Sequence, residues 1–352
     1  MTERPRLSDT RPTAPIESPQ VSSKGEPVEE SGGEAVFVEA AARLHFGVLD
    51  LRGARGRWFG GIGTAAPAPT LLVSATAADA LHVAGEDAER AADFATRFLE
   101  HYRIEGGARL HVHRTLPRHA GLGSGTQLAM AVGRALATLR GIDADPPALA
   151  RAMGRAWRSA VGTWTFAGGG LVVEGGRRAG RDECGPLLAR VPFPPEWRCV
   201  VVVPDAASGL SGESEAVAFD RLAAPPEHEV ERVAHLVLMS LLPALADADV
   251  EAFGTALTAI QEITGRWFAP VQGGTFAPGL SEELVRRMSE WGASGVGQSS
   301  WGPAVYGVVA DRDTAVRLAD RVRAVLRPAG TVYEGAFPAE GARVWWGHMR
   351  GK

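Results

Sequence analysis

The chain has 352 residues, of which 45% are hydrophobic and 22% are charged, so it is long enough for two globular lobes. Its net charge of −4 argues against a nucleic-acid binder or a protein held on an anionic membrane by charge. No apolar run reaches the roughly 18 residues that span a bilayer. Cys184 and Cys199 form neither a metal-binding nor a disulfide pattern. We therefore expect a cytoplasmic protein without membrane or nucleic-acid partners.

The N-terminal segment, residues 1–34, contains five prolines and no Phe, Trp or Tyr. Such a segment cannot bury enough apolar area to offset its ordering entropy, so we expect a disordered leader. Strands and helices then follow in mixed order. The expected elements are strands at 35–51 and 70–76, a helix at 86–102, a strand at 109–114, helices at 124–139 and after Pro147, and strands at 166–174 and 199–204.

The second half begins with helices and ends in a β-α-β unit. Its expected elements are helices at 214–221, 227–245, 250–264 and 281–291, a strand at 303–309, a helix at 311–326, and strands near 331–337 and 343–347. This order predicts an α+β fold of two lobes.

The segment 117–127 reads PRHAGLGSGTQ and joins a predicted strand to a long helix rich in Ala and Leu. Its three glycines let the backbone approach an anion closely, and a helix N-terminus supplies unpaired N–H groups and a positive dipole. These features predict a phosphate-binding loop. The alternative is an ordinary glycine-rich turn in which Ser124 caps the helix.

The same segment resembles the phosphate-binding motif of the GHMP kinases. Within that superfamily the chain resembles the β-ribofuranosylaminobenzene 5′-phosphate synthases and the related C-glycoside synthases of formycin- and pyrazofurin-type C-nucleosides. The matching pieces are ARLHFGVLDL (42–51), GGIG (60–63), GLGSGTQL (121–128), Arg158-Ser159 with Gly162-Thr163, and GVGQSSWGPAVYG (295–307).

This resemblance implies a GHMP-kinase-like α+β fold with a ribosomal-S5-like N-terminal lobe at 35–205 and a ferredoxin-like C-terminal lobe at 206–352. It also implies an enzyme that condenses phosphoribosyl pyrophosphate with an aromatic carboxylate and releases CO₂ and pyrophosphate. In the kinases an Asp lies near the attacking hydroxyl, but here that position is Gly162. The acidic metal ligand expected just upstream is also missing, because 154–158 reads GRAWR.

The resemblance places phosphoribosyl pyrophosphate on the glycine loop, on the Arg-Ser element and on a third, Ser-rich loop. The donor-binding candidates are Gly121, Leu122, Gly123, Ser124, Gly125, Thr126, Gln127, Arg158, Ser159, Gly297, Gln298, Ser299 and Ser300. Mg²⁺ is the expected cofactor, with Ser124 and Glu213 as candidate ligands.

Candidates for catalysis are Arg43, His45 and Arg158. Arg43 and His45 alternate on one strand and so share a face; they reach the 5′-phosphate or the acceptor carboxylate, or are an ordinary surface arginine and strand histidine. His45, Trp164 and Trp301 are candidates for binding the aromatic acceptor, although the pattern slightly favours a core position for Trp301.

The acceptor itself stays open. Residues 163–170 read TWTFAGGG and depart from the family pattern, which favours a smaller heteroaromatic acid such as an aminopyrazole carboxylate. The alternative acceptors are para-amino- and para-hydroxybenzoate, as in methanopterin biosynthesis. A GHMP small-molecule kinase and a non-catalytic ligand-sensing protein are the other functions that the sequence allows. A homodimer is compatible with it.

Overall fold

The computed structural model describes residues 20–22, 34–181, 183–205, 209, 212–326 and 329–348. Its strands are β1 (Gln20–Ser22), β2 (Glu34–Asp50), β3 (Arg57–Ala78), β4 (His82–Gly85), β5 (Gly107–Arg114), β6 (Leu171–Glu174), β7 (Arg177–Arg178), β8 (Leu187–Val191), β9 (Arg198–Pro204), β10 (Gly295–Gln298), β11 (Val305–Val309), β12 (Gly330–Ala336) and β13 (Arg343–His348).

The helices are α1 (Ala88–Tyr102), α2 (Ser124–Leu139), α3 (Pro146–Ala152), α4 (Val161–Ala167), α5 (Gly212–Arg221), α6 (Glu227–Leu236), α7 (Leu242–Ala246), α8 (Val250–Gln272), α9 (Leu280–Glu290) and α10 (Arg312–Leu326). A π-helical turn at Val237–Leu241 joins α6 to α7.

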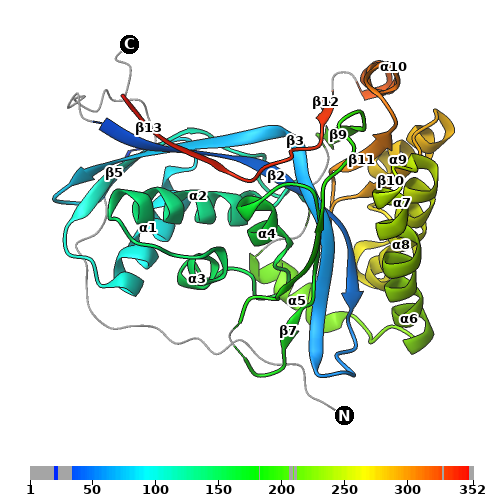
Figure 1. Cartoon of the computed structure of the whole chain (residues 1–352), viewed down its shortest axis with the longest axis horizontal. Helices are drawn as coiled ribbons and strands as arrows, with labels where there is room; N and C mark the ends of the chain where they lie inside the picture. Colours follow the sequence, from blue (N-terminus) through cyan, green and yellow to red (C-terminus); the bar gives the residue numbers. More distant parts are fainter. Residues whose placement is uncertain are drawn as a thin grey trace.

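The larger sheet runs in the order β1-β4-β5-β3-β2-β13, with β6 and β7 paired to β3 and β8 paired to β6. Helices α1 to α4 lie along one side of it, and α2 runs beneath β2 and β3 (Figure 1). Helix α2 buries most of its length because it is rich in Ala, Leu and Met, which pack closely against the strands. This packing holds the N-terminal end of α2 in a fixed position below the sheet.

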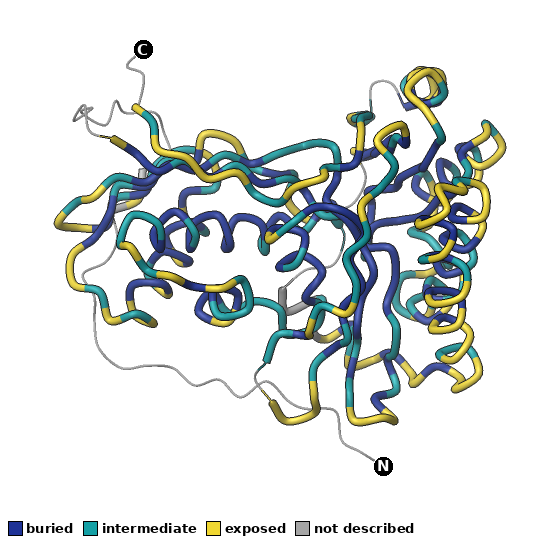
Figure 2. Tube along the Cα trace, viewed as in Figure 1, coloured by how far each residue is buried: buried dark blue, intermediate teal, exposed yellow. Residues whose placement is uncertain are grey.

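The smaller sheet is antiparallel, in the order β10-β11-β9-β12. Successive side chains of β9 point to opposite faces. Val200 and Val202 therefore pack against α9 and α10, whereas Cys199 and Val201 join the main core. Figure 2 shows these two buried layers in dark blue, with exposed residues concentrated on the outer surface of α6 to α8.

The division between lobes differs from the prediction at residue 205. Strand β9, expected in the N-terminal lobe, lies in the middle of the smaller sheet. Strand β13, expected in the C-terminal lobe, returns to the larger sheet and pairs antiparallel with β2. A strand's own pattern of side chains does not specify which strand it pairs with, so these two partners are decided by the path of the chain.

Three local predictions also need correction. Residues 20–22 of the expected leader form β1, which pairs parallel with β4. The strand expected at 70–76 is much longer, because β3 already begins at Arg57. Residues 161–167 are helical, and only 171–174 of the predicted strand at 166–174 form a strand. Among the residues that the structure describes, no helix is long and apolar enough to cross a membrane.

Candidate active site between the two lobes

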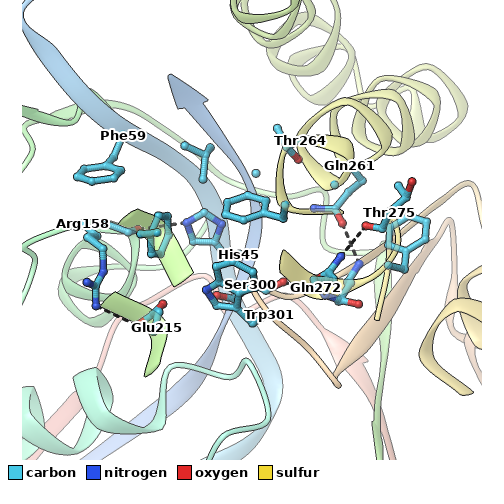
Figure 3. A pocket seen from close by; sticks show the side chains of 18 of the residues that line it. His45, Phe59, Arg158, Glu215, Gln261, Thr264, Gln272, Thr275, Ser300 and Trp301 are labelled. Atoms are coloured by element: carbon cyan, nitrogen blue, oxygen red, sulfur yellow. Dashed lines mark hydrogen bonds and ion pairs between the residues drawn. The ribbon is translucent and has the colours of Figure 1, made fainter. Parts of the chain in front are cut away.

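A pocket lies where β2 and β3 meet α5, α8 and the loop after β10. It is lined by Arg43, His45, Gly47, Val48, Phe59, Arg158, Ser159, Glu215, Phe219, Gln261, Thr264, Gly265, Phe268, Gln272, Thr275, Phe276, Gln298, Ser300 and Trp301. Figure 3 shows His45 near the centre, with Arg158 and Glu215 on one side and the glutamines on the other. Both lobes therefore contribute side chains to this pocket.

The glycine loop forms the N-terminal end of α2, next to this pocket. Gly121 and Gly123 have left-handed backbone angles, with φ of 76° and 73°, which glycine adopts without strain. Gly123 occupies the N-cap position, and no side chain caps the helix. The alternative in which Ser124 is the cap is therefore wrong, and the first turn of α2 keeps the uncapped amides of an anion site.

Arg43 connects the loop to the pocket. Its Nη1 donates to the carbonyl of Gly121 at 2.9 Å, and its backbone N–H donates to the carbonyl of Leu122 at 2.9 Å. The Nε atom is buried without a partner among the described residues. Burial lowers the pKa of Arg43 to about 10, so the group stays charged at neutral pH. Arg43 is thus a loop-associated cation and not a surface arginine.

His45 is buried and uncharged. Its backbone N–H donates to Ser299 Oγ at 2.9 Å, and its Nε2 is hydrogen-bonded to Ser159 Oγ at 3.2 Å. Burial, together with the charge of Arg43, lowers the pKa of His45 to about 3. His45 therefore cannot supply a positive charge to a phosphate, but its neutral ring can exchange hydrogen bonds with a substrate.

The third predicted motif folds against the first. Ser299 is buried, and its hydroxyl donates to the carbonyl of Gly121 at 2.7 Å while accepting from the backbone of His45. The Gln298 amide donates to Gln272 Oε1 and to the Ser300 carbonyl, both at 3.0 Å. Ser299 thus links β2 to the glycine loop, and Gln298 links the third motif to the end of α8. Contact of either residue with the donor stays a prediction.

Gly297 lies outside the pocket lining, between Gln261 and the hydroxyl of Tyr306. A Cβ at this position would meet both groups at 2.5 Å, so glycine is needed for packing. Ser300 lines the pocket with a positive φ of 55°. Of the four residues predicted on this loop, only Gln298 and Ser300 line the pocket directly.

The position of the missing kinase carboxylate is filled by packing. A Cβ on Gly162 would lie 2.9 Å from Thr126 Cγ2, and Gln127 Nε2 donates to the Gly162 carbonyl at 3.0 Å. Thr126 and Gln127 thereby fasten the start of α2 to α4. An acidic side chain like the one that orients the attacking hydroxyl in a kinase would have to displace Thr126 from this position.

Arg158 and Ser159 line the pocket as predicted neighbours of the loop. Arg158 Nη2 lies 3.1 Å from Glu215 Oε2, and its guanidinium stacks over the Phe219 ring at 5.2 Å. Figure 3 marks this ion pair with a dashed line. In the sequence Glu215 stands in a polar stretch typical of a solvated helix start, but in the structure it lines the pocket and pairs with Arg158.

Aromatic rings form one wall of the pocket. Trp301 is buried and packs edge-to-face on Phe268, with ring centroids 4.8 Å apart, and on Phe219, at 5.6 Å. It is therefore both a core residue and a lining residue. Trp164 does not line the pocket: its Nε1 donates to the Gly185 carbonyl at 2.8 Å. The placement of residues 163–170 around the acceptor is not supported by this geometry.

Glu174 is a buried carboxylate that the sequence analysis did not identify. It accepts hydrogen bonds from the backbone N–H groups of Ala160, at 3.2 Å, and Gly176, at 2.8 Å. Burial raises the pKa of Glu174 to about 7, although these two hydrogen bonds oppose the shift. The available signal was a lone Glu that ends the apolar run LVVE.

Metal-binding side chains are sparse here. Among the described residues, no three His, Cys, Asp or Glu side chains come together. Glu213 falls in α5, but its side chain lies outside the described part of the chain. Ser124 is buried at the start of α2. Mg²⁺ commonly takes one or two protein ligands and completes its shell with substrate phosphates and water, so this site fits a metal only when it arrives with the donor.

A two-lobe α+β fold with a glycine loop at a buried helix N-terminus defines the GHMP class. Residues 88–168 match the model of the GHMP kinases N terminal domain, and residues 241–327 match that of the GHMP kinases C terminal domain. The homoserine kinase of Cytophaga hutchinsonii is 16% identical, with a TM-score of 0.64 over 92% of this chain and 100% of its own. A mevalonate pyrophosphate decarboxylase from Streptococcus pyogenes is 14% identical, also with a TM-score of 0.64, over 89% and 99%. The predicted GHMP fold is confirmed.

Named relatives narrow this class. The beta-ribofuranosylphenol 5′-phosphate synthase of Methanothermobacter thermautotrophicus is 32% identical over 321 residues, which cover 85% of this chain and 96% of that protein. The synthase of the same name from Archaeoglobus fulgidus is 35% identical over 280 residues, covering 76% and 85%. The chain therefore belongs to the β-ribofuranosylphenol 5′-phosphate synthase family of enzymes.

Proposed function

We propose that this chain transfers the 5-phosphoribosyl group of phosphoribosyl pyrophosphate to a ring carbon of an aromatic carboxylic acid. The observation that carries the proposal is a retained phosphate loop beside Gly162, which lacks the carboxylate of a kinase and is packed against Thr126. Such a site binds a pyrophosphate as a leaving group without activating a hydroxyl. The products are a C-riboside 5′-phosphate, CO₂ and pyrophosphate.

Charge stabilisation is the main contribution of the protein to this reaction. The bond between C1′ and the pyrophosphate oxygen breaks, and its electron pair leaves with pyrophosphate. The α2 amides face the charge that develops there, with Arg43 beside the loop. The ring carbon that bears the carboxylate then attacks C1′. Loss of CO₂ returns the electrons of its C–C bond to the ring.

The pocket wall fits a planar acceptor. Trp301, Phe219 and Phe268 provide an aromatic surface, and neutral His45 faces the same space. The relatives are named for a ribofuranosylphenol product, which favours a hydroxybenzoate as the acceptor here. An aminopyrazole carboxylate is the alternative, but its sequence argument rested on Trp164, which lies outside the pocket lining.

We also propose that Mg²⁺ enters with the donor and neutralises part of the pyrophosphate charge. The described residues offer no preformed cluster of acidic ligands, so the phosphates would supply most of the coordination shell. Neither a kinase nor a non-catalytic sensor has a specific observation in its favour. Packing at Gly162 disfavours the first, and an intact loop and pocket disfavour the second.

The test is to incubate the protein with phosphoribosyl pyrophosphate, Mg²⁺ and single acids labelled at the carboxyl carbon, and to measure CO₂, pyrophosphate and the product mass. We expect equal amounts of CO₂ and pyrophosphate with 4-hydroxybenzoate, and neither product without an acceptor. Pyrophosphate without CO₂ would instead indicate an N- or O-ribosyltransferase. Release of ADP from ATP with a metabolite alcohol would indicate a kinase.

A further inference from the structure

Four arginines lie close to one another beside the first turn of α2. Arg90 and Arg97 come from α1, and Arg155 and Arg158 come from the segment between α3 and α4. A Cβ on Gly125, in the first turn of α2, would collide with the Arg155 guanidinium and would lie 3.7 Å from Arg90 Nη1. The absence of a side chain at residue 125 is thus what allows arginine to reach the helix N-terminus.

Two of these arginines already have acidic partners. Arg90 Nε donates to both carboxylate oxygens of Asp87, at 2.9 and 3.0 Å, and Arg158 pairs with Glu215. No described residue accepts a hydrogen bond from Arg155, and its Nε is buried without a partner. The Arg155 guanidinium only stacks over the Phe94 ring, at 5.2 Å. The loop therefore carries a largely buried cation beside a helix N-terminus. The charge of Glu215 acts on this cation, but no acid in the described part of the chain accepts a hydrogen bond from it.

This arrangement opposes folding in the absence of a ligand. Burial, and then the charges of Arg90 and Arg97, lower the pKa of Arg155 to about 10, although the charge of Glu215 opposes the shift. The charged form is therefore less favourable in the folded chain than in water. The group nevertheless stays charged at neutral pH. A cation held among like charges next to uncapped amides is expected where an anion completes the site.

We propose that Arg155, supported by Arg90, forms an anion subsite at Gly125 that binds the pyrophosphate group of the ribosyl donor. The inference rests on the proposed function, and it assigns Arg155 a direct donor contact. A guanidinium matches phosphate oxygens with two parallel N–H groups, and the α2 amides lie on the other side of the same anion. Arg43 lies by Gly123 and Arg155 lies by Gly125, so each of these two cations adjoins one glycine of the loop.

Direct binding tests this subsite without any turnover. Inorganic pyrophosphate with Mg²⁺ is titrated calorimetrically into the wild type, Arg155→Gln and Arg155→Lys. We expect Arg155→Gln to weaken binding by about 10- to 100-fold, the usual loss of a charge-assisted contact, and Arg155→Lys to weaken it less. Arg151→Gln is the matched control, because it removes one exposed charge from the neighbouring α3 without touching the loop.

Gly125→Ala provides a second test, because it displaces Arg155 from the loop without replacing it. Its φ is compatible with any residue in a helix, but its Cβ pushes the Arg155 guanidinium off the loop while leaving the charge in place. We expect weaker pyrophosphate binding in this variant too. The ligand-free melting temperature of Arg155→Gln should not fall, since the change removes like-charge repulsion. A purely structural arginine would lower it.

Several outcomes would overturn the assignment. They are wild-type pyrophosphate affinity in a folded Arg155→Gln protein, an equal loss in Arg151→Gln, or a loss confined to ribose 5-phosphate, which would place the other end of the donor here. Failure of the proposed function is separate. A protein that binds pyrophosphate through Arg155 but releases no CO₂ with any aromatic acid keeps the subsite and loses the reaction.

Discussion

Ionisable side chains near the pocket hold charge states that differ from those in water. His45 is neutral throughout the physiological range, since burial and Arg43 lower its pKa to about 3. The pKa of Glu174 shifts in the opposite direction, because burial raises it to about 7. The two groups lie close together: a Cβ on Gly61 would be 3.0 Å from Glu174 Oε1 and 3.2 Å from His45 Nε2. Below about pH 7 the protonated Glu174 therefore places no negative charge behind the pocket.

The raised pKa of Glu174 predicts a measurable pH dependence of stability. The folded state keeps its proton up to about pH 7, whereas the unfolded state loses it near the ordinary value of 4.5. Between these two values the folded state binds more protons, so stability falls as pH rises, by up to about 3 kcal/mol. Glu174→Gln removes this dependence. Urea unfolding at pH 5 and pH 8 should show a smaller loss in the variant than in the wild type.

His45 has the opposite effect below its ordinary pKa of 6.5, because there the unfolded state binds the extra proton and stability rises with pH. This contribution is the same in both proteins and cancels in the comparison. Glu262→Gln, an exposed change on α8, is the control and should leave the wild-type slope intact. Equal slopes in the wild type and Glu174→Gln would show that Glu174 is ionised in the folded state.

The glycine loop and α2 act together as one element. Gly121 must lack a side chain because a Cβ would collide with the Ser299 carbonyl, so the first and third motifs touch backbone to backbone. Gly123 has φ of 73°, and its Cβ position faces Arg43 Nε at 3.3 Å. Close approach and left-handed geometry therefore both require glycine at this end of α2.

Charge and steric effects at Gly123 can be separated by comparing Gly123→Asp with Gly123→Asn. Both side chains tolerate a left-handed backbone better than other residues do, so each variant should lose about 1–2 kcal/mol of stability. Only Asp adds a negative charge beside the anion site and pairs with Arg43. We expect Asp to abolish binding of phosphoribosyl pyrophosphate and Asn to weaken it, as measured by calorimetry beside melting curves.

Gly123→Ala also adds a Cβ without a charge, but alanine has no polar group that favours the left-handed region, so Asn matches Asp better. Equal affinities of the Asp and Asn variants would show that a negative charge at residue 123 does not affect binding of the donor. Undiminished binding in a folded Gly123→Asp protein would place the pyrophosphate away from this loop.

Across the whole molecule, the two lobes are held together by strands that cross between them. The chain leaves the larger sheet for β9 and returns to it in β13, which pairs with β2 from Arg343↔Glu39 to His348↔Glu34 (Figure 1). Trp345 stacks on Phe37 with ring centroids 5.5 Å apart. Because β2 also carries Arg43 and His45, the C-terminal strand supports the strand on which the pocket is built.

Deleting residues 343–352 should therefore destabilise more than the C-terminal end. The loss of one six-residue strand pairing is worth on the order of 3 kcal/mol, and it leaves the edge of β2 unpaired. We expect a lower unfolding midpoint in urea and faster amide exchange at Val36 and Val38. Deletion of residues 349–352 alone keeps β13 and serves as the control. An unchanged midpoint without β13 would show that β2 is held by β3 alone.

Local sequence determined much of what this chain can do. Glycines 121, 123 and 125 before an Ala/Leu helix predicted the loop and the helix 124–139 that the structure contains, because both depend on neighbouring residues only. Gly162 likewise pointed away from phosphoryl transfer. The family followed from these motifs.

Only the tertiary structure decided which distant residues share the site. It placed Arg155 on the loop and Glu174 behind His45, and it removed Trp164 from the pocket. It also assigned β9 and β13 to the opposite sheets from those expected. These outcomes depend on strand pairing and burial between segments far apart in the chain, and a local pattern of hydrophobicity is the same whichever partner a strand finds.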